Sequence, residues 1–239
     1  MRLVYFDPGP KGHYHPGEPR YNQYLRELGY TGENPWDEWA NAAAGDDGEV
    51  LSAWLMKYAS RPTRLPEEHT ETPYMTRRAM EFVEQQGQEP WCLHLSYIKP
   101  HWPYIVSAPY HEMYCAEQVT PVLRSNAERE SPHPIYAAYM QHRPGRAFSQ
   151  PGVREAVIPA YMGLISQIDD QLGLLFEFLQ AKGQFDNTMI VFTSDHGDYL
   201  GDHWLGDKDF MHDAAVKIPM IVVDPSAAAD KTRGSVNAA

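Results

Sequence analysis

Residues 188–203 read TMIVFTSDHGDYLGDH, and this stretch decides the fold. Its first part, TMIVFTS (188–194), is rich in β-branched residues and predicts a strand. The remainder, DHGDYLGDH, predicts the loop after that strand. In α/β sheets, ligands bind beyond the carboxyl ends of the strands. The acidic and imidazole side chains at the end of this strand therefore predict a ligand site there.

The segments before this stretch predict two helices. Residues 72–86 (TPYMTRRAMEFVEQQ) predict a helix with Thr72 as N-cap, Pro73 at the first helical position and Gly87 as the stop. Residues 158–182 predict the longest helix, because apolar side chains recur every three or four positions before a glycine. Both helices have the apolar stripe that packs against a core.

Two further strands are expected. PWCLHLSYI (90–98) predicts a buried strand, and KIPMIVV (217–223) predicts another, in which Pro219 favours an edge or a strand start. Residues 105–150 are rich in proline and predict loops with short helices. Helices and strands that alternate in this way predict an α/β fold, with a sheet flanked by helices.

The N-terminal region has a different composition. Residues 1–70 are rich in glycine, proline and aromatic residues and show little periodicity, so they predict a lid, a substrate loop or a segment cut from its packing partner. We interpret residues 1–239 as one domain, with 1–70 as a loop-rich substrate or lid region and 71–239 as the α/β core portion.

Composition excludes some functional classes. The formal net charge of −12 argues against nucleic acid as a partner, because a phosphate-binding surface needs clustered cations. The two cysteines indicate a reducing compartment rather than a disulfide framework. The sequence has no apolar run of the ~20 residues that a membrane helix needs and no apolar leader, so we expect a cytoplasmic protein without a membrane partner.

Asp195 and His196 are the candidate metal ligands. A carboxylate and an imidazole both bind divalent cations, and Gly197 lets the backbone turn beside them. The alternative is a polar loop whose Asp and His side chains cap the next helix. The triplet alone does not decide between the two.

His101 and Lys208 are the candidates for handling an anion. His101 lies in KPHWP (99–103), where two prolines stiffen the loop and present the imidazole in one direction. It would act as a general acid or bind an anion, or it is a chance surface histidine. Lys208 would neutralise an anionic ester oxygen beside a metal, or it forms an ordinary solvated ion pair.

Taken together, the motifs resemble a known family. YMGLISQIDDQLG (161–173), GQFDNTMIVFTSDHGDYLGDH (183–203) and KPHWP (99–103), with RLP (64–66) and TRRA (76–79), resemble the sulfatase family of the alkaline phosphatase superfamily. The nearest likeness is to its phosphonate monoester hydrolase and arylsulfatase branch. The resemblance runs from about Asp7 to Asp224.

The resemblance implies an alkaline-phosphatase-like sheet and one divalent metal ion, Ca²⁺ or Mn²⁺. It assigns Asp195 and His196 as metal ligands. It assigns His101 and Lys208 as the groups that bind the ester's anionic oxygens or protonate the leaving group, with Lys99 as a neighbouring substrate-binding residue. The implied partner is a small anionic ester, and a homo-oligomer is left open.

The sequence also departs from the family. Family members begin with an apolar strand that ends in paired polar ligands. A Cys- or Ser-x-Pro-x-Arg motif then supplies the formylglycine nucleophile. SRPTR (60–64) fits by letters but lacks the helix start that should follow, so we predict that Ser60 is not the nucleophile. We expect an internal fragment, in which the N-terminal strand and the C-terminal subdomain are missing.

These observations predict part of a metal-dependent hydrolase of sulfate, phosphonate or phosphate esters, with the chain alone inactive or weak. The alternative is a non-catalytic, truncated remnant of such an enzyme. A two-zinc phosphatase or phosphomutase fits less well, because the additional His and Asp ligands have no matching motifs.

Overall fold

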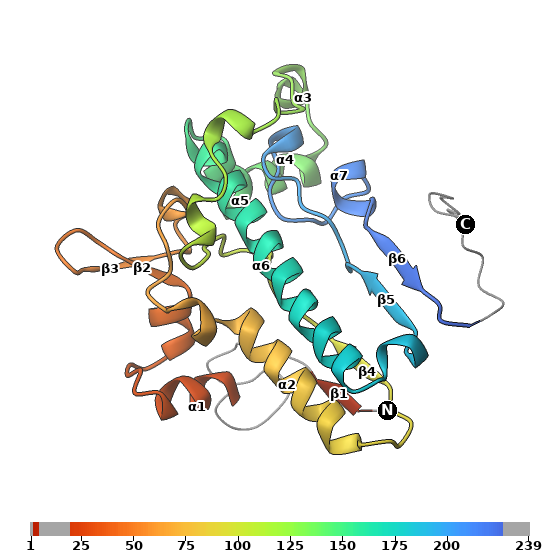
Figure 1. The fold of residues 1–239 in the computed structure, drawn as a ribbon. Helices are drawn as coiled ribbons and strands as arrows, with labels where there is room; N and C mark the ends of the chain where they lie inside the picture. The colour runs from red at the N-terminus through yellow and green to blue at the C-terminus, as the bar shows by residue number, and fades with distance from the viewer. Residues whose placement is uncertain (1, 5–19, 227–239) are drawn as a thin grey trace.

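One long helix is the axis of the molecule. The computed structural model describes residues 2–4 and 20–226. Helix α6 (Val153–Ala181) runs diagonally through it. The hairpin of β2 (Ala42–Ala44) and β3 (Val50–Ser52) and the helix α1 (Arg20–Glu27) lie on one side, and the pair of β5 (Ile190–Thr193) and β6 (Met220–Val223) lies on the other (Figure 1). Helix α2 (Glu71–Gln86) packs against α6. The arrangement is a mixed α/β fold, as the sequence predicts.

Both predicted long helices are present, but each begins earlier than expected. Helix α2 has Thr70 as its N-cap rather than Thr72, so Pro73 lies at the third helical position. Helix α6 begins at Val153, after Gly152 with φ +79°, and continues through Pro159. Proline favours the first turn of a helix, and this preference placed the expected start of α2 at Pro73, whereas the expected start of α6 followed the apolar periodicity and missed its first turn.

The strands form three separate pairs in the part of the chain that is described. Strand β1 (Arg2–Val4) pairs parallel with β4 (Leu93–Leu95), β2 (Ala42–Ala44) pairs antiparallel with β3 (Val50–Ser52), and β5 (Ile190–Thr193) pairs antiparallel with β6 (Met220–Val223).

All three predicted strands exist, but each is shorter than expected. The predicted burial of the 90–98 strand is wrong, because His94 is exposed and its two leucine neighbours in β4 are only partly buried. Every residue of β6 is exposed as well. A strand's side chains are buried by elements that pack on the faces of its sheet, and the described residues cover β4 only in part and leave β6 uncovered.

Residues 20–70 are packed more tightly than the lid that the composition suggests. Tyr21 and Leu25 of α1 bury against Trp36, Leu65 and Met75 in one core cluster. The part of the predicted loop-rich region that lies in residues 1–19 is outside the described residues, apart from the strand β1.

Short helices and single turns complete the described chain. Residues 105–150 contain short helices joined by loops, as predicted. No helix in the described part is long and apolar enough to cross a membrane. The remaining elements are η1 (Trp36–Ala40), η2 (Met56–Tyr58), η3 (Glu67–His69), η4 (Tyr110–Glu112), η5 (Ala116–Gln118), α3 (Ala127–Glu130), α4 (Pro134–Met140), α5 (Arg143–Phe148), η6 (Phe185–Asn187), η7 (Asp202–Trp204) and α7 (Asp213–Val216).

Two core clusters position the loops that carry the candidate site. Tyr104, in the loop that follows His101, is buried with Phe148 of α5 and Val157 of α6. Tyr199 and Leu205, in the loop after β5, are buried together in a second cluster. Both loops are therefore fixed to the helical body by apolar burial.

Candidate functional site

Asp195 and His196 lie directly after β5, as the strand pattern predicts. The Asp195 side chain is 89% exposed, and the His196 side chain is 25% exposed. Oδ2 of Asp195 lies 3.7 Å from Nε2 of His196. The two side chains therefore present an oxygen and a nitrogen to the same space.

The protonation of His196 suits a metal ligand. Its Nδ1 lies 2.7 Å from the carbonyl oxygen of Gly197. A carbonyl only accepts, so Nδ1 is the donor, and in the neutral ring Nε2 keeps a free lone pair. Imidazoles that bind metals are usually held in this way by a second partner on the other nitrogen. The donor set at this point therefore fits a divalent cation, but it supplies only two ligands.

No larger metal cluster was found in the described residues, 2–4 and 20–226: no group of three or more His, Cys, Asp or Glu side chains there could hold a metal ion. Calcium typically takes six to eight oxygen ligands. An ion held by Asp195 and His196 would need its other ligands from water or from residues outside that part.

The structure brings His101 and Lys208 together. Nζ of Lys208 donates a hydrogen bond to Nε2 of His101 at 3.0 Å, although the residues lie 107 positions apart. Nδ1 of His101 is the donor to the carbonyl oxygen of Trp102 at 2.7 Å, so Nε2 is the acceptor. The His101 ring also meets the His196 ring edge to face, with 5.9 Å between centroids. The candidate ligands and the candidate anion-binding groups thus form one cluster.

Burial favours the neutral form of the His101 imidazole. Desolvation lowers its pKa below the usual value, the bond to the Trp102 carbonyl raises it, and the positive charge of Lys208 lowers it. Oδ1 of Asp207 lies 3.2 Å from Nζ of Lys208 and 3.9 Å from Nε2 of His101, and its charge raises the pKa of His101. In its neutral form the ring accepts a hydrogen bond from the Lys208 ammonium, which has further N–H groups that can donate to an anion.

Lys99 does not join this cluster, and its expected role in substrate binding stays a prediction. Its Nζ donates to Oδ1 of Asn41 and to the carbonyl of Pro103, both at 2.9 Å. It also lies 3.6 Å from Oε2 of Glu71, and both of these side chains are 4% exposed. Lys99 is a buried ion-pair residue that anchors the KPHWP loop from inside.

Gly197 is required by close packing rather than by a left-handed turn. A Cβ at this position would lie 2.0 Å from the carbonyl oxygen of Ala214. The Gly197 N–H donates to the carbonyl of Ala215 at 2.8 Å. The backbone beside Asp195 and His196 is therefore pressed against the start of α7.

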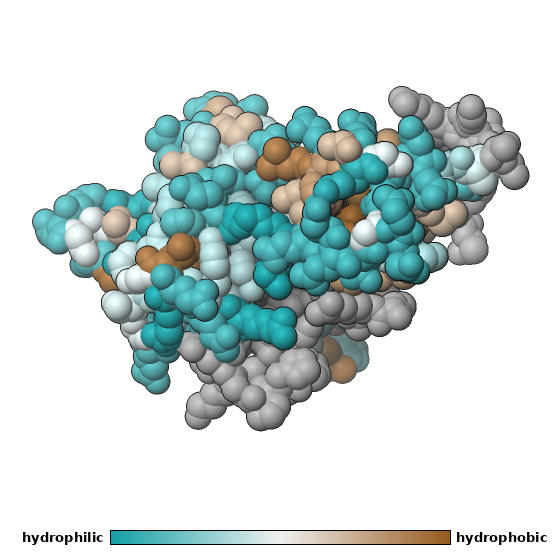
Figure 2. All heavy atoms as spheres, turned by 60° about the horizontal axis from the view of Figure 1, so that its bottom comes forward, coloured by the Kyte–Doolittle hydropathy of each residue, from teal (hydrophilic) through white to brown (hydrophobic). Residues whose placement is uncertain are grey.

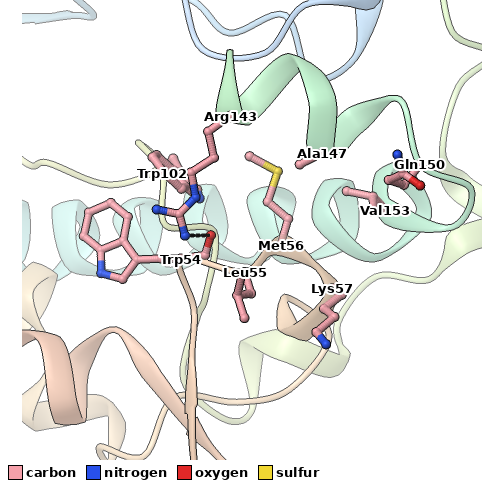
Figure 3. Close-up of a pocket in the computed structure, with 9 residues that line it drawn as sticks. All are labelled: Trp54, Leu55, Met56, Lys57, Trp102, Arg143, Ala147, Gln150 and Val153. Atoms are coloured by element: carbon pink, nitrogen blue, oxygen red, sulfur yellow. Dashed lines mark hydrogen bonds between the residues drawn. The ribbon is translucent and has the colours of Figure 1, made fainter. Parts of the chain in front are cut away.

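A pocket lies on another part of the KPHWP loop. It has a volume of about 210 Å³, and Figure 3 shows Trp54, Met56, Trp102 and Arg143 among its lining residues. Arg143 donates to the Trp54 carbonyl at 2.9 Å. None of the candidate site residues lines this apolar pocket, so it is distinct from the cluster around His101.

Sequence reasoning missed two neighbours of the cluster. Asp207 contacts both Lys208 and His101, and Tyr104 fixes the loop of His101 from the core. Asp207 directly precedes Lys208, which was a usable signal, whereas nothing in the local pattern distinguished Tyr104. Ser60 lies in an exposed turn after η2, and its predicted lack of modification stays a prediction.

Comparison with known proteins gives the family of this chain. A sequence model of the sulfatase family matches residues 17–238. The chain belongs to the sulfatase family. Over 176 residues it is 38% identical to the multifunctional alkaline phosphatase superfamily protein PehA of Trinickia caryophylli, a match that covers 69% of this chain and 34% of that protein. It is 28% identical over 147 residues to a choline-sulfatase of Rhizobium meliloti, covering 61% of this chain and 28% of the relative.

Solved structures confirm the fold of this sulfatase-family chain. The phosphonate monoester hydrolase SpPMH from Silicibacter pomeroyi superposes with a TM-score of 0.74 at 24% identity, over 86% of this chain and 41% of that one. The alkaline-phosphatase-like fold and the predicted family are both confirmed. The chain spans about a third of the two curated relatives.

Proposed function

We propose that this chain supplies the His101, Lys208, Asp195 and His196 part of a metal-dependent site that hydrolyses sulfate or phosphonate esters. Membership of the sulfatase family and relatives named as sulfatases support a hydrolase. The observation that carries the residue roles is the 3.0 Å contact between Lys208 and His101, with the His196 ring beside it.

Each residue has a role that follows from its contacts. Asp195 and His196 would hold the divalent ion, Ca²⁺ or Mn²⁺, which when bound stabilises negative charge on the ester oxygens. Lys208 donates hydrogen bonds to an anionic oxygen and balances its charge. His101 accepts a hydrogen bond from the Lys208 ammonium through Nε2 and so orients Lys208 toward the anion, or, with a proton taken from water at Nε2, it donates that proton to the leaving oxygen.

The first experiment is a titration of the chain with Mn²⁺, followed by the electron paramagnetic resonance signal of the free ion. We expect weak binding, because two protein ligands leave most coordination positions to water. Asp195→Ala and His196→Ala should each abolish it. Asp47→Ala, in the exposed turn of the β2–β3 hairpin, is the matched control and should bind like the wild type. Equal Mn²⁺ affinity in the wild type and Asp195→Ala would refute the assigned metal site.

The second experiment separates an enzyme from a non-catalytic remnant. Turnover of nitrophenyl sulfate and of a phenylphosphonate monoester is measured with and without Mn²⁺. We expect little or no turnover by the chain alone, and restored turnover when a family N-terminal segment is fused ahead of Met1. A fusion protein that binds Mn²⁺ and still turns over neither ester would favour the remnant.

A further inference from the structure

The side chain of Asp198 accepts hydrogen bonds from three directions. Its Oδ2 accepts from the hydroxyl of Tyr104 at 2.5 Å. Its Oδ1 accepts from the backbone N–H groups of Leu200 at 3.0 Å and Asp207 at 3.1 Å. The carboxylate therefore joins the loop after β5 to two other segments of the chain.

These two segments carry the pair at the centre of the candidate site. Tyr104 lies three positions after His101 and is 1% exposed, so its hydroxyl is a fixed point on the His101 side. Asp207 immediately precedes Lys208 on the other side. One carboxylate thus connects the loop of His101 with the loop of Lys208.

The Lys208 side of this connection is held in a costly backbone conformation. Asp207 and Asp209 have φ values of +67° and +99°, so Lys208 lies between two non-glycine residues with positive φ. Positive φ is unfavourable for residues other than glycine and persists only where neighbouring contacts enforce it. Two hydrogen bonds hold the backbone of Asp207. Its N–H donates to the Asp198 carboxylate, and its carbonyl accepts from the N–H of Tyr199 at 3.0 Å.

We propose that Asp198 is a positioning residue that sets the contact between Lys208 and His101 by holding Asp207 and Tyr104 on one carboxylate. The importance of this role for catalysis rests on the proposed function, whereas the three hydrogen bonds of Asp198 are observed independently of it. Three accepted hydrogen bonds use most of the acceptor capacity of the carboxylate, which leaves it little suited to touch a substrate directly.

The test measures how readily Lys208 reacts. The whole chain is acetylated with an N-hydroxysuccinimide ester, and each lysine is followed by mass spectrometry. Lys208 is 33% exposed and held by two partners, and Lys217, which is 75% exposed, serves as the internal reference. Asp198→Ala removes all three hydrogen bonds. Asp198→Asn keeps them, because Oδ1 still accepts from both N–H groups and the amide donates to the Tyr104 hydroxyl.

We expect the Lys208-to-Lys217 labelling ratio to rise by at least about twofold in Asp198→Ala, since the released loop opens locally. Asp198→Asn should stay close to the wild type. Tyr104→Phe removes a single hydrogen bond, should give a smaller rise, and carries the test if Asp198→Ala does not fold. A wild-type ratio in folded Asp198→Ala, or an Asn variant that behaves like the Ala variant, would overturn the proposal.

A second arm separates this proposal from the proposed function. Phenylphosphonate added before labelling should protect Lys208 in the wild type, because the anion would occupy the space beside its ammonium group. If the variants change the labelling ratio but phenylphosphonate gives no protection, the positioning role stands and anion binding by this cluster fails.

Discussion

At the scale of single residues, the site depends on which nitrogen of each histidine carries the proton. In both His101 and His196, Nδ1 donates to the carbonyl of the next residue in the chain. Both rings therefore turn Nε2 outward as an acceptor. In His101 that acceptor meets an ammonium group, and in His196 it faces the carboxylate of Asp195. The same local backbone contact thus leaves Nε2 as the acceptor in both rings, as the proposed roles of His101 and His196 require.

The charge of Lys208 should be visible in the titration of His101. Nuclear magnetic resonance of the metal-free chain should show His101 with a pKa below the ordinary ~6.5, chiefly because of desolvation. Lys208→Met should raise that pKa, because a cation beside the ring is lost. Lys217→Met, an exposed change on α7, is the control and should leave the titration of His101 unchanged. An unchanged His101 titration in Lys208→Met would show that the two groups do not interact in solution.

The lowered pKa of His101 also predicts how the free energy of unfolding changes with pH. With a folded pKa below its unfolded value, His101 binds fewer protons in the folded chain than in the unfolded chain at mildly acidic pH. Its contribution to stability is therefore lost as the pH falls below about 6.5. Urea unfolding at pH 7.5 and pH 5.5 should show a smaller loss between the two pH values for His101→Asn than for the wild type. An equal loss would mean that other groups control this pH range.

At the scale of elements, buried polar contacts tie the KPHWP loop to α2 and η1. Lys99 lies against Glu71 in the first turn of α2, and the indole of Trp36 donates to the other oxygen of Glu71 at 2.6 Å. Removing one partner of such a pair leaves an uncompensated buried charge. Lys99→Met should therefore destabilise the chain by about 3–5 kcal/mol.

A double variant tests the pairing directly. Lys99→Met combined with Glu71→Gln removes both charges and keeps an acceptor for the Trp36 indole. We expect it to recover about 1–3 kcal/mol relative to Lys99→Met, measured by urea denaturation. If the effects of the two single changes on the free energy of unfolding simply added in the double variant, Lys99 and Glu71 would be independent of each other.

The sequence predicts the positions of helices, strands and loops better than it predicts the burial and long-range contacts of their side chains. The DHG and KPHWP motifs predicted that Asp195, His196 and His101 lie in loops after strands, and the structure has them there, because each motif follows an apolar strand. The burial of Lys99 was not predicted, since a lysine beside a candidate catalytic histidine is expected to be exposed until the interior position of Asn41 and Glu71 is known. The connections through Asp198 and Tyr104 depend on residues 94 positions apart, which local patterns cannot reveal.

Gly197 shows how an element constrains the site. Gly197→Ala should cost about 1–3 kcal/mol, because the new Cβ collides with the Ala214 carbonyl at the start of α7. The shift should also weaken Mn²⁺ binding at Asp195. Gly173→Ala, in the middle of α6 with nothing within 4 Å, is the control and should gain about 0.5–1 kcal/mol. Equal stability of the two variants in urea unfolding would refute the collision.

At the scale of the whole molecule, apolar surface is distributed unevenly. The face shown in Figure 2 is mostly hydrophilic, and apolar residues reach it in separate patches. The β5–β6 pair differs, because large apolar side chains are exposed along both strands: Val191, Phe192, Met220, Ile221, Val222 and Val223. Exposed strands rich in apolar residues tend to pair with other chains.

We therefore expect the isolated chain to self-associate through the β5–β6 pair. Val191 and Val222 are cross-strand partners, each 51% exposed, so Val191→Lys with Val222→Glu introduces opposite charges that face each other. This variant keeps the net charge of −12 and should be monomeric in sedimentation velocity at concentrations where the wild type associates. Ile165→Lys with Leu174→Glu is the matched control on α6, where the two side chains are 47% and 49% exposed. It makes the same two charge changes at exposed apolar positions nine residues apart on one helix, and it should associate like the wild type. If the strand variant still associates, or if the helix variant loses association equally, the contact between copies lies on another surface.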